Sequence, residues 1–340
     1  MKLSAALAVL VGLAVAITLI VTHDAAAIGR AILDAGWGIL IVIALHLPQI
    51  LFSALGWRSL VTEPQAPSLA MFSCLRWIRE SVNSLLPVAQ VGGEFVRARL
   101  LALQGVSLKS SGASVTVDLT TEMASQFVFT VLGISLLLVT SHGPTVVHWA
   151  IGGLATAVVI GIAFVMAQTL GLFKLFERLL IRLADKVGWS SLNGIAGLHD
   201  TIIELYRNPR RLWSSSAYHL VSWFLGVLET WAVLHVLGVE AGLREAMIVE
   251  SLGQAVRSAG FAVPGALGVQ EGGYILICGL LGISPQNALE LSLIRRIREV
   301  VLGLPGVIAW HRIEAYFAKR KTSSHEVRQS PEAAWKGNGQ

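Results

Sequence analysis

The sequence predicts an all-α polytopic membrane protein with about six transmembrane helices and two re-entrant helical hairpins arranged as an inverted repeat. Three observations support this fold class: an apolar composition, six long apolar runs, and two interrupted segments that match each other. Of the 340 residues, 54% are hydrophobic and 14% are charged, and the mean hydropathy is +0.67. Because soluble proteins are roughly one quarter charged, this composition predicts a chain that lies largely within a lipid bilayer.

Six apolar runs are long enough to cross a bilayer, since a transmembrane helix needs about 20 residues. The first run follows Lys2 and exceeds the apolar part of an ordinary signal peptide, which favours a retained anchor over a cleaved signal. Cys74 and Cys278 lie in different apolar stretches and predict neither a disulfide framework nor a metal site. The six runs cover residues 3–21, 37–55, 114–139, 146–170, 212–237 and 285–310.

Positive charge predicts the orientation. Lysine and arginine cluster within residues 76–109, 174–211 and 312–321, whereas the loop at 141–148 has neither. Under the positive-inside rule the three clusters face the cytoplasm, and so do both termini. A polar tail at residues 319–340 follows the membrane domain and is predicted to be disordered, because it lacks apolar periodicity.

A basic stripe follows the fourth apolar run. Its spacing predicts a helix on the cytoplasmic bilayer surface within residues 172–206, with its cations against anionic headgroups. A cytoplasmic helix that packs on its own protein is the alternative. The stripe consists of Lys174, Arg178, Arg182 and Lys186.

Two interrupted segments match each other at a constant separation of 177 positions. A regular spanning helix tolerates such interruptions poorly, because proline removes a backbone hydrogen bond and charge is costly in hydrocarbon. Under the positive-inside rule, the copy around residues 70–140 and the copy around 247–312 cross the membrane in opposite directions. The sequence therefore predicts an inverted repeat. The match pairs Pro87 with Pro264, Glu94 with Glu271, Gly105 with Gly282, Ser107 with Ser284 and Glu122 with Glu299.

Each interrupted segment is predicted to enter the membrane and return to the same face. Irregular backbone at that depth is tolerated where protein or a wet cavity surrounds it, and paired breaks in inverted repeats mark the central site of transporters. Proline kinks and glycine packing faces in ordinary helices are the alternative. The residues expected to form the breaks are Pro87, Gly92, Gly93, Glu94, Pro264, Gly265, Gly268, Glu271 and Gly272.

Charged residues fall at membrane depth in the third and sixth runs. Each costs about 2.5–3.5 kcal/mol at the bilayer centre, so they must be paired or hydrated. Asp118 corresponds to Arg295 in the repeat, and Glu80 to Arg257, so these pairs are expected to face each other. Static ion pairs that join the two halves are the alternative to a functional role, and a position of residues 285–298 outside the membrane is a second alternative. The expected network comprises Glu80, Asp118, Glu122, Arg295, Arg298 and Glu299.

Polar side chains that flank the interruptions could bind a phosphate or carboxylate headgroup, although simple snorkelling of arginine to the interface is an equal alternative. His46, His219 and His235 occur singly, without metal-ligand spacing; hydrogen-bonded core positions are favoured for them over a proton relay. No metal is expected. The headgroup candidates are Arg76, Arg79, Asn83, Arg97 and Arg257.

Motifs of common enzymes are missing from the sequence. It has no Gly-x-x-x-x-Gly-Lys-Ser/Thr loop, no Gly-x-Ser-x-Gly elbow, no His-Glu-x-x-His pair and no Cys-x-x-Cys set. Asp118 and Glu122 could act as acid and base, but nothing supplies a nucleophile or a metal beside them. We therefore expect no enzymatic activity, no cofactor and no nucleic-acid partner.

The stretches RWIRESVNSLLPVAQVGGEFVRARLLALQGVS and GQAVRSAGFAVPGALGVQEGG resemble the family named after the transmembrane region of lysylphosphatidylglycerol synthase. Within this family, the chain is most similar to hopanoid biosynthesis-associated membrane proteins of the HpnL type. The resemblance extends over most of residues 35–312. The matching residues are Asn83, Pro87, Gly92, Gly93, Glu94 and Arg97 in the first signature, and Pro264, Gly265, Gly268, Glu271 and Gly272 in the second.

The resemblance implies a flippase-like fold and a lipid translocase or transporter of a bacterial inner membrane. Its implied partners are a hopanoid or related polar lipid and hopanoid-pathway membrane proteins, in addition to the anionic bilayer surface expected from the basic stripe. In the synthases an aminoacyl-transferase domain follows the membrane part; here about 28 residues follow Arg312, so lysyl transfer is expected to be absent. An intramembrane lipid-modifying enzyme and a scaffold for hopanoid synthesis are the alternatives.

Overall fold

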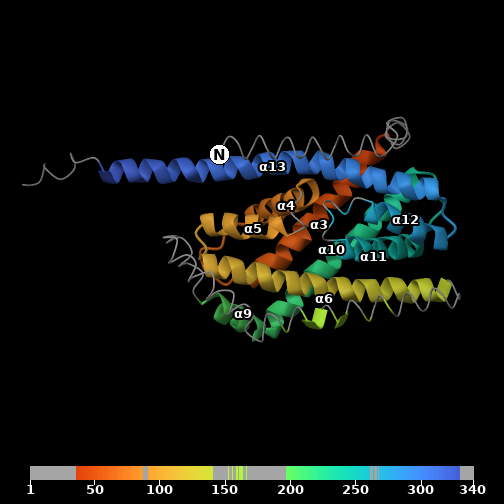
Figure 1. The fold of residues 1–340 in the computed structure, drawn as a ribbon, viewed down its shortest axis with the longest axis horizontal. Helices are drawn as coiled ribbons and strands as arrows, with labels where there is room; N and C mark the ends of the chain where they lie inside the picture. The colour runs from red at the N-terminus through yellow and green to blue at the C-terminus, as the bar shows by residue number, and fades with distance from the viewer. Residues whose placement is uncertain are drawn as a thin grey trace, which may run out of the picture.

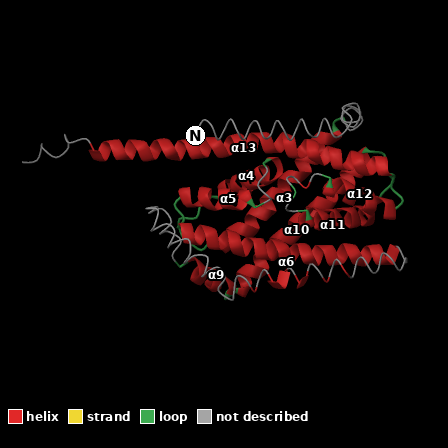
Figure 2. Ribbon diagram, in the orientation of Figure 1, coloured by secondary structure: helices red, strands yellow, loops and turns green. Residues whose placement is uncertain are grey.

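The computed structural model describes residues 36–86, 91–140, 197–260 and 268–329, together with single positions between 152 and 166 and at 263 and 266. Within these ranges the regular secondary structure is helical, which confirms the predicted all-α class (Figures 1 and 2). The helices are α3 (Gly38–Leu60), α4 (Leu69–Leu85), α5 (Gly92–Leu103), α6 (Leu108–Thr140), α9 (Leu198–Tyr206), α10 (Pro209–Val236), α11 (Leu243–Ala259), α12 (Val269–Leu280) and α13 (Pro285–Gln329).

Three of the described helices, α3, α6 and α10, are long and apolar enough to cross a membrane. They cover three of the six predicted spans. The predicted span at residues 3–21 lies outside the described residues, as does most of the span at 146–170. The sixth run lies in α13, whose buried face carries arginines. The count of six spans therefore stays a prediction.

In Figure 1 the long helices α13 and α6 run on opposite sides of α3, α4, α5, α11 and α12, and α9 lies on the outer side of α6. Between them α3 packs extensively on α10, while α4 packs on α13 and α11 packs on α6. The short helix α9 packs on α6 and is the described end of the predicted surface helix at 172–206. Residues 172–196 lie outside the described part of the chain.

Helix bounds in the two interrupted segments repeat with the separation of the sequence match. The breaks separate α4 from α5 and α11 from α12, and both second helices have 12 residues. The helix α12 begins and ends 177 positions after α5, and α13 begins 177 positions after α6. The two segments therefore share one local fold.

The same capping geometry opens α6 and α13. Ser107 Oγ accepts a hydrogen bond from the Ser110 N–H at 3.3 Å, and Ser284 Oγ accepts one from the Asn287 N–H at 3.1 Å. Such a bond satisfies a free donor at a helix start. The preceding turns contain glycines with positive φ, 103° and 74°, a conformation that suits glycine because it lacks a Cβ. Those glycines are the matched pair Gly105 and Gly282.

Helix α13 continues beyond residue 319, where the sequence predicted a disordered tail, and ends at Gln329. Its last turns contain lysine, arginine, glutamate and glutamine but neither glycine nor proline. Glycine and proline are the residues least favourable inside a helix, and extension of an existing helix needs no new nucleus. Residues 330–340 lie outside the described range.

The loop before α4 is bound to the start of α6 through Glu63. Its carboxylate accepts hydrogen bonds from the Ser107 N–H at 3.0 Å and from Ser107 Oγ at 2.7 Å. Partial burial acts to raise the pKa of Glu63, but the hydrogen bonds from Ser107 and the charge of Lys109 hold that pKa below its usual value of 4.5.

We expect Glu63→Gln to lower the free energy of unfolding at neutral pH by about 1 kcal/mol, because the amide replaces a charged acceptor. Since the folded pKa is lowered, the stabilisation is complete above the usual pKa and is lost as pH falls through the folded pKa. Thermal unfolding in detergent at neutral pH and at about pH 4 measures the difference. An equal difference between the variant and the wild type at both pH values would contradict this role.

Candidate functional site

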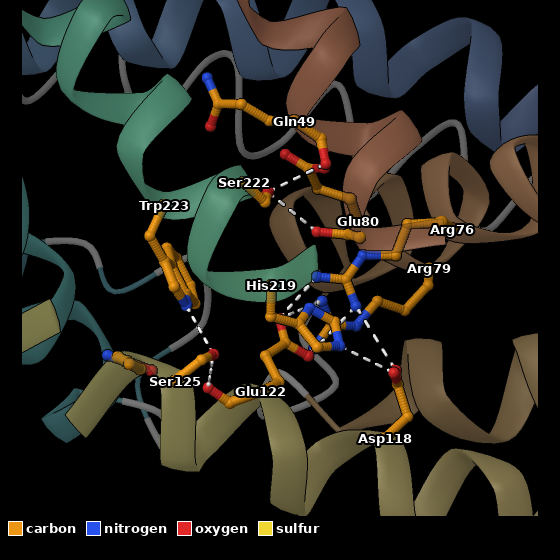
Figure 3. A network of polar contacts seen from close by, with 12 residues as sticks. Gln49, Arg76, Arg79, Glu80, Asp118, Glu122, Ser125, His219, Ser222 and Trp223 are labelled. Carbon is orange, nitrogen blue, oxygen red and sulfur yellow. Dashed lines mark hydrogen bonds and ion pairs between the residues drawn. The ribbon is translucent and has the colours of Figure 1, made fainter. Parts of the chain in front are cut away.

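A first cluster of buried charges lies where α4, α5, α6 and α10 meet. Figure 3 shows side chains from α4, α6 and α10 pointing toward one another around Asp118 and Glu122. We call this group the first charge cluster: Arg76, Arg79, Glu94, Arg97, Asp118, Glu122 and His219.

Asp118 is at the centre of this cluster. Its Oδ2 accepts a hydrogen bond from Arg97 NH1 at 2.6 Å, and its Oδ1 lies 2.8 Å from His219 Nε2. The Arg97 guanidinium also lies over the Trp57 ring, 4.7 Å from its centroid. Asp118 and Arg97 are both fully buried, so this pair is withdrawn from solvent.

The other two carboxylates each accept from two arginines. Glu94 accepts hydrogen bonds from Arg79 and from Arg97, the latter at 2.6 Å. Glu122 accepts hydrogen bonds from Nη1 of Arg76 at 3.1 Å and from both terminal nitrogens of Arg79 at 3.3 Å. Three arginines thus face three carboxylates, the balance that buried charges need.

Asn83 and Gly93 fix the start of α5 against α4. Asn83 Oδ1 accepts a hydrogen bond from the Gly93 N–H at 2.8 Å. A Cβ at position 93 would lie 2.7 Å from this same Oδ1, closer than side-chain atoms approach. A glycine is therefore required here, and it places Glu94 next to Arg79.

A second charge cluster lies among α10, α11, α12 and α13. Arg296 links Glu271 and Glu299, with distances of 3.1 Å to each carboxylate, and Arg257 also binds Glu299. The cluster comprises Glu229, Glu250, Arg257, Glu271, Arg295, Arg296, Arg298 and Glu299.

Two further pairs complete the second cluster. Arg295 binds Glu250, with Thr230 as an additional partner, and Arg298 binds Glu229. Four arginines here face four carboxylates.

Glu271 has two roles at the second break. One of its oxygens accepts the Gly268 N–H at 2.7 Å at the start of α12, and the other binds Arg296. Gly268 has a φ of 77°. Gly92 and Gly272 lie in the first turns of α5 and α12. Among the predicted break residues, Pro87, Pro264 and Gly265 lie outside the described residues.

The structure corrects the predicted partners of the membrane charges. Asp118 pairs with Arg97 and His219 rather than with Arg295, whose carboxylate partner is Glu250. Repeat-related positions are not in contact here because each charge has a nearer partner in its own cluster.

The second expected pair, Glu80 with Arg257, is also replaced by other partners. Glu80 interacts electrostatically with Arg257 but forms its ion pair with His46, while Arg257 binds Glu299.

Sequence reasoning missed two carboxylates, Glu229 and Glu250, which are almost fully buried. The sequence did contain a signal for Glu229, because it is the single charged residue in the apolar run at 212–237. A single carboxylate in such a run predicts a buried cationic partner, and that partner is Arg298.

His46 links Glu80 of α4 to Glu229 of the second cluster. Its Nε2 lies 2.7 Å from Glu80 and its Nδ1 lies 3.1 Å from Glu229. A small pocket between α3, α4 and α13 opens beside it. The pocket is lined by groups that include His46, Trp77, Glu80, Ser84, Arg298 and Leu302.

Comparison with known families identifies the family to which the chain belongs. A family model described as the lysylphosphatidylglycerol synthase TM region matches residues 5–306. The chain belongs to this family. Both charge clusters lie within the matched range. No curated protein and no solved structure matches the chain.

Membership in the lysylphosphatidylglycerol synthase TM-region family confirms the family predicted from residues 76–107 and 253–273. With the three apolar helices, it makes the chain a multi-pass membrane protein. It also links the chain to membrane lipid. The hopanoid-associated HpnL type stays a prediction within the family.

Proposed function

We propose that this protein is a lipid translocase of a bacterial inner membrane, which moves a hopanoid or related polar lipid between leaflets. The observation that carries the proposal is the pair of buried, charge-balanced clusters at two matching helix breaks. Because such charges are costly in hydrocarbon, they mark functional paths in membrane proteins. Transporters place these paths between inverted repeats.

Reciprocal packing supports an inverted repeat. In the 177-residue correspondence, α4 is equivalent to α11 and α6 is equivalent to α13. The contact of α4 with α13 therefore has its counterpart in the contact of α11 with α6, and both are present. A two-fold axis between the halves produces this arrangement, in which the first helix of each copy packs on the long helix of the other copy. The central pair, α3 and α10, is itself related by the same correspondence.

Helix lengths support re-entrant hairpins. The helices α4 and α11 each have 17 residues, and α5 and α12 each have 12. At 1.5 Å per residue these are roughly 25 and 18 Å long, shorter than the hydrocarbon core of about 30 Å. A helix of either length followed by a break does not cross the core, so each pair is proposed to turn back within the membrane.

Arginines of the clusters are suited to a lipid headgroup. One guanidinium nitrogen of Arg97 is buried without a hydrogen-bond partner among the described residues, and such an unsatisfied donor favours an additional acceptor. Arg79 and Arg257 are more accessible, with side-chain exposures of 16% and 20%. We propose that these two arginines receive a phosphate or carboxylate first and that Arg97 binds it deeper in the cluster.

The proposed cycle exchanges one set of ion pairs for another. When a headgroup binds Arg79 or Arg97, it competes with Glu94, which both arginines contact. Release of Glu94 weakens the contact between α4 and α5 at the first break. Asp118, Glu122, Arg295 and Glu299 are proposed to restore the closed arrangement as the two halves rock.

Leaflet transfer by the purified protein tests the proposal. In phosphatidylcholine vesicles that contain fluorescent phosphatidylglycerol, or a labelled hopanoid, dithionite quenches label in the outer leaflet alone. We expect the wild type to increase transfer of at least one of these lipids severalfold over protein-free vesicles, and Glu122→Gln to remove most of that increase.

The matched control is Glu314→Gln, which alters an ion pair of Arg99 at the surface and should leave transfer unchanged. Mass spectrometry of the recovered lipid separates the alternatives. A changed lipid mass without leaflet transfer would support an intramembrane enzyme. Absence of both transfer and mass change would support a scaffold.

A further inference from the structure

His46 is held between two carboxylates in the interior of the protein. Its Nε2 lies 2.7 Å from Glu80 Oε1 and its Nδ1 lies 3.1 Å from Glu229 Oε2. His46 and Glu229 are buried, with exposed fractions of 6% and 1%. The Glu80 side chain is 32% exposed and lines the small pocket between α3, α4 and α13.

The hydrogen bonds of this group require one proton beyond those of neutral histidine and ionised glutamates. A neutral imidazole has one N–H, and an ionised carboxylate accepts but does not donate. Glu229 already accepts a hydrogen bond from Arg298 at Oε1 and another from Gln49 at Oε2, the latter at 2.6 Å. Glu229 is therefore ionised, and Nδ1 of His46 supplies the N–H that faces it.

The contact between His46 Nε2 and Glu80 Oε1 then needs a proton of its own. That proton resides either on Nε2, as an imidazolium beside a carboxylate, or on Oε1, as a carboxylic acid beside neutral histidine. In its absence two lone pairs would face each other at 2.7 Å. Loss of the proton therefore disfavours this contact and drives Glu80 toward the pocket.

The charge balance of the interior agrees with this count. The two charge clusters together with Glu80 contain seven arginines and eight carboxylates. These groups alone, without the histidines, carry one net negative charge, which one further positive charge cancels. Because an uncompensated charge in the interior is costly, the proton at His46 and Glu80 stabilises the closed arrangement of the structure.

Every helix packed on His46 contributes to its electrostatic surroundings. From α10, Glu229 faces Nδ1. From α13, Arg298 acts directly on His46, and Glu299 lies next to Arg298 and lines the pocket. Arg76 of α4 acts on Glu80. The carboxylates of α6 are bound by the arginines of the first cluster and by His219.

We propose that His46 and Glu80 form the site at which one proton binds and couples proton movement to lipid translocation. This inference rests on the proposed function. His46 and Glu80 belong to the first repeat, whereas Glu229 and Arg298 belong to the second. The contact that needs the proton joins α3 to α4 within the first repeat, next to Glu229 and Arg298 of the second. Release of the proton into the pocket separates α4, which also carries Arg76 and Arg79 of the first charge cluster, from α3.

Glu80→Gln is the decisive variant. Its amide N–H donates to the lone pair of neutral His46 Nε2, so the contact is kept without an exchangeable proton. Vesicles with fluorescent phosphatidylglycerol and an imposed gradient of about one pH unit should show wild-type transfer that is several times faster than without a gradient. Glu80→Gln should transfer at the same rate with and without the gradient, whereas Glu314→Gln should behave as the wild type.

A second measurement reads the proton site without lipid transport. Ser84 lines the pocket, and Ser84→Cys in a background with Cys74 and Cys278 replaced by alanine gives one thiol. We expect maleimide labelling of this thiol to rise more steeply between about pH 5 and pH 9 with Glu80 present than with Glu80→Gln. Each rate is divided by the fraction of that variant's thiol that is ionised at the same pH, measured by thiolate absorbance, and the ratio of the two corrected rates is then compared between pH values.

The outcomes separate the two proposals. A labelling ratio that does not change with pH, or a wild-type transfer rate that does not respond to the gradient, overturns the proton site. Absence of transfer of any lipid by any variant, with a labelling ratio that does rise with pH, overturns the translocase and leaves the proton site supported.

Discussion

Replacement of Asp118 by asparagine is expected to lower the free energy of unfolding by about 3–5 kcal/mol, the cost of breaking a buried ion pair by removing one partner. Asparagine preserves the volume of the side chain, so no cavity contributes to the loss. In the variant, Arg97 keeps one ionised partner, Glu94, which it shares with Arg79. Three arginines, two of them buried, then face two carboxylates, so the cluster carries a surplus positive charge.

Charge balance rather than geometry is responsible for this loss, and a double variant tests that cause. Combined Asp118→Asn and Arg97→Gln removes one charge of each sign, so we expect it to be more stable than Asp118→Asn alone. Unfolding in detergent against temperature measures both variants. A double variant less stable than either single variant would contradict this explanation.

The exposed pair of Arg99 and Glu314 provides the control for Asp118. Arg99 is 66% exposed, and surface ion pairs contribute about 0–1 kcal/mol. Glu314→Gln should therefore change stability much less than Asp118→Asn, although both replace one carboxylate by its amide.

The repeat was predictable from the sequence because it depends on local chemistry. Gly105 and Gly282 are required by the turns before α6 and α13, and Ser107 and Ser284 by the helix starts. These requirements are local, so they recur 177 positions apart independently of how the other helices pack. The bounds of α5 and α12 and the starts of α6 and α13 follow at this offset, whereas α11 lies three positions earlier than the offset from α4 would place it.

Partners of the buried charges were not predictable in the same way. Asp118 has several arginines within reach along the sequence, and its choice of Arg97 depends on how α5 packs against α6. Apolar helices of similar length pack in many ways, since packing in membranes depends on small residues and on polar contacts between helices. Glu250 is an example. It lies in α11, and nothing in its local sequence indicates that its partner is Arg295, 45 residues later on α13.

Alanine at Gly133 or Gly306 is expected to lower the free energy of unfolding by about 1–3 kcal/mol at each position. Gly133 of α6 contacts Ser251 of α11, and a Cβ there would lie 2.7 Å from the Ser251 Cβ. Gly306 of α13 contacts Ser81 of α4 in the same manner, at 2.8 Å. Rotation of the serine hydroxyl relieves neither contact, because the serine Cβ is fixed to its helix.

Both contacts join helices of the two matched segments, since α6 packs on α11 and α13 packs on α4. A helix pushed outward at either place separates one half from the other. We therefore expect both variants to lose stability and lipid transfer together. Gly279→Ala is the matched control, since nothing lies within 4 Å of its Cβ; alanine there should be neutral or stabilising by up to about 1 kcal/mol.

Exchange of the small residue between the helices distinguishes close packing from a special need for glycine. Combined Gly306→Ala and Ser81→Gly moves the missing side chain from α13 to α4 and leaves room for the new methyl group. If close approach of the helices is what matters, this variant should recover most of the stability that Gly306→Ala loses, and Ser251→Gly should do the same for Gly133→Ala. Failure of both exchanges, measured by thermal unfolding in detergent, would show that these glycines act through the backbone of their own helices rather than through contact between the halves.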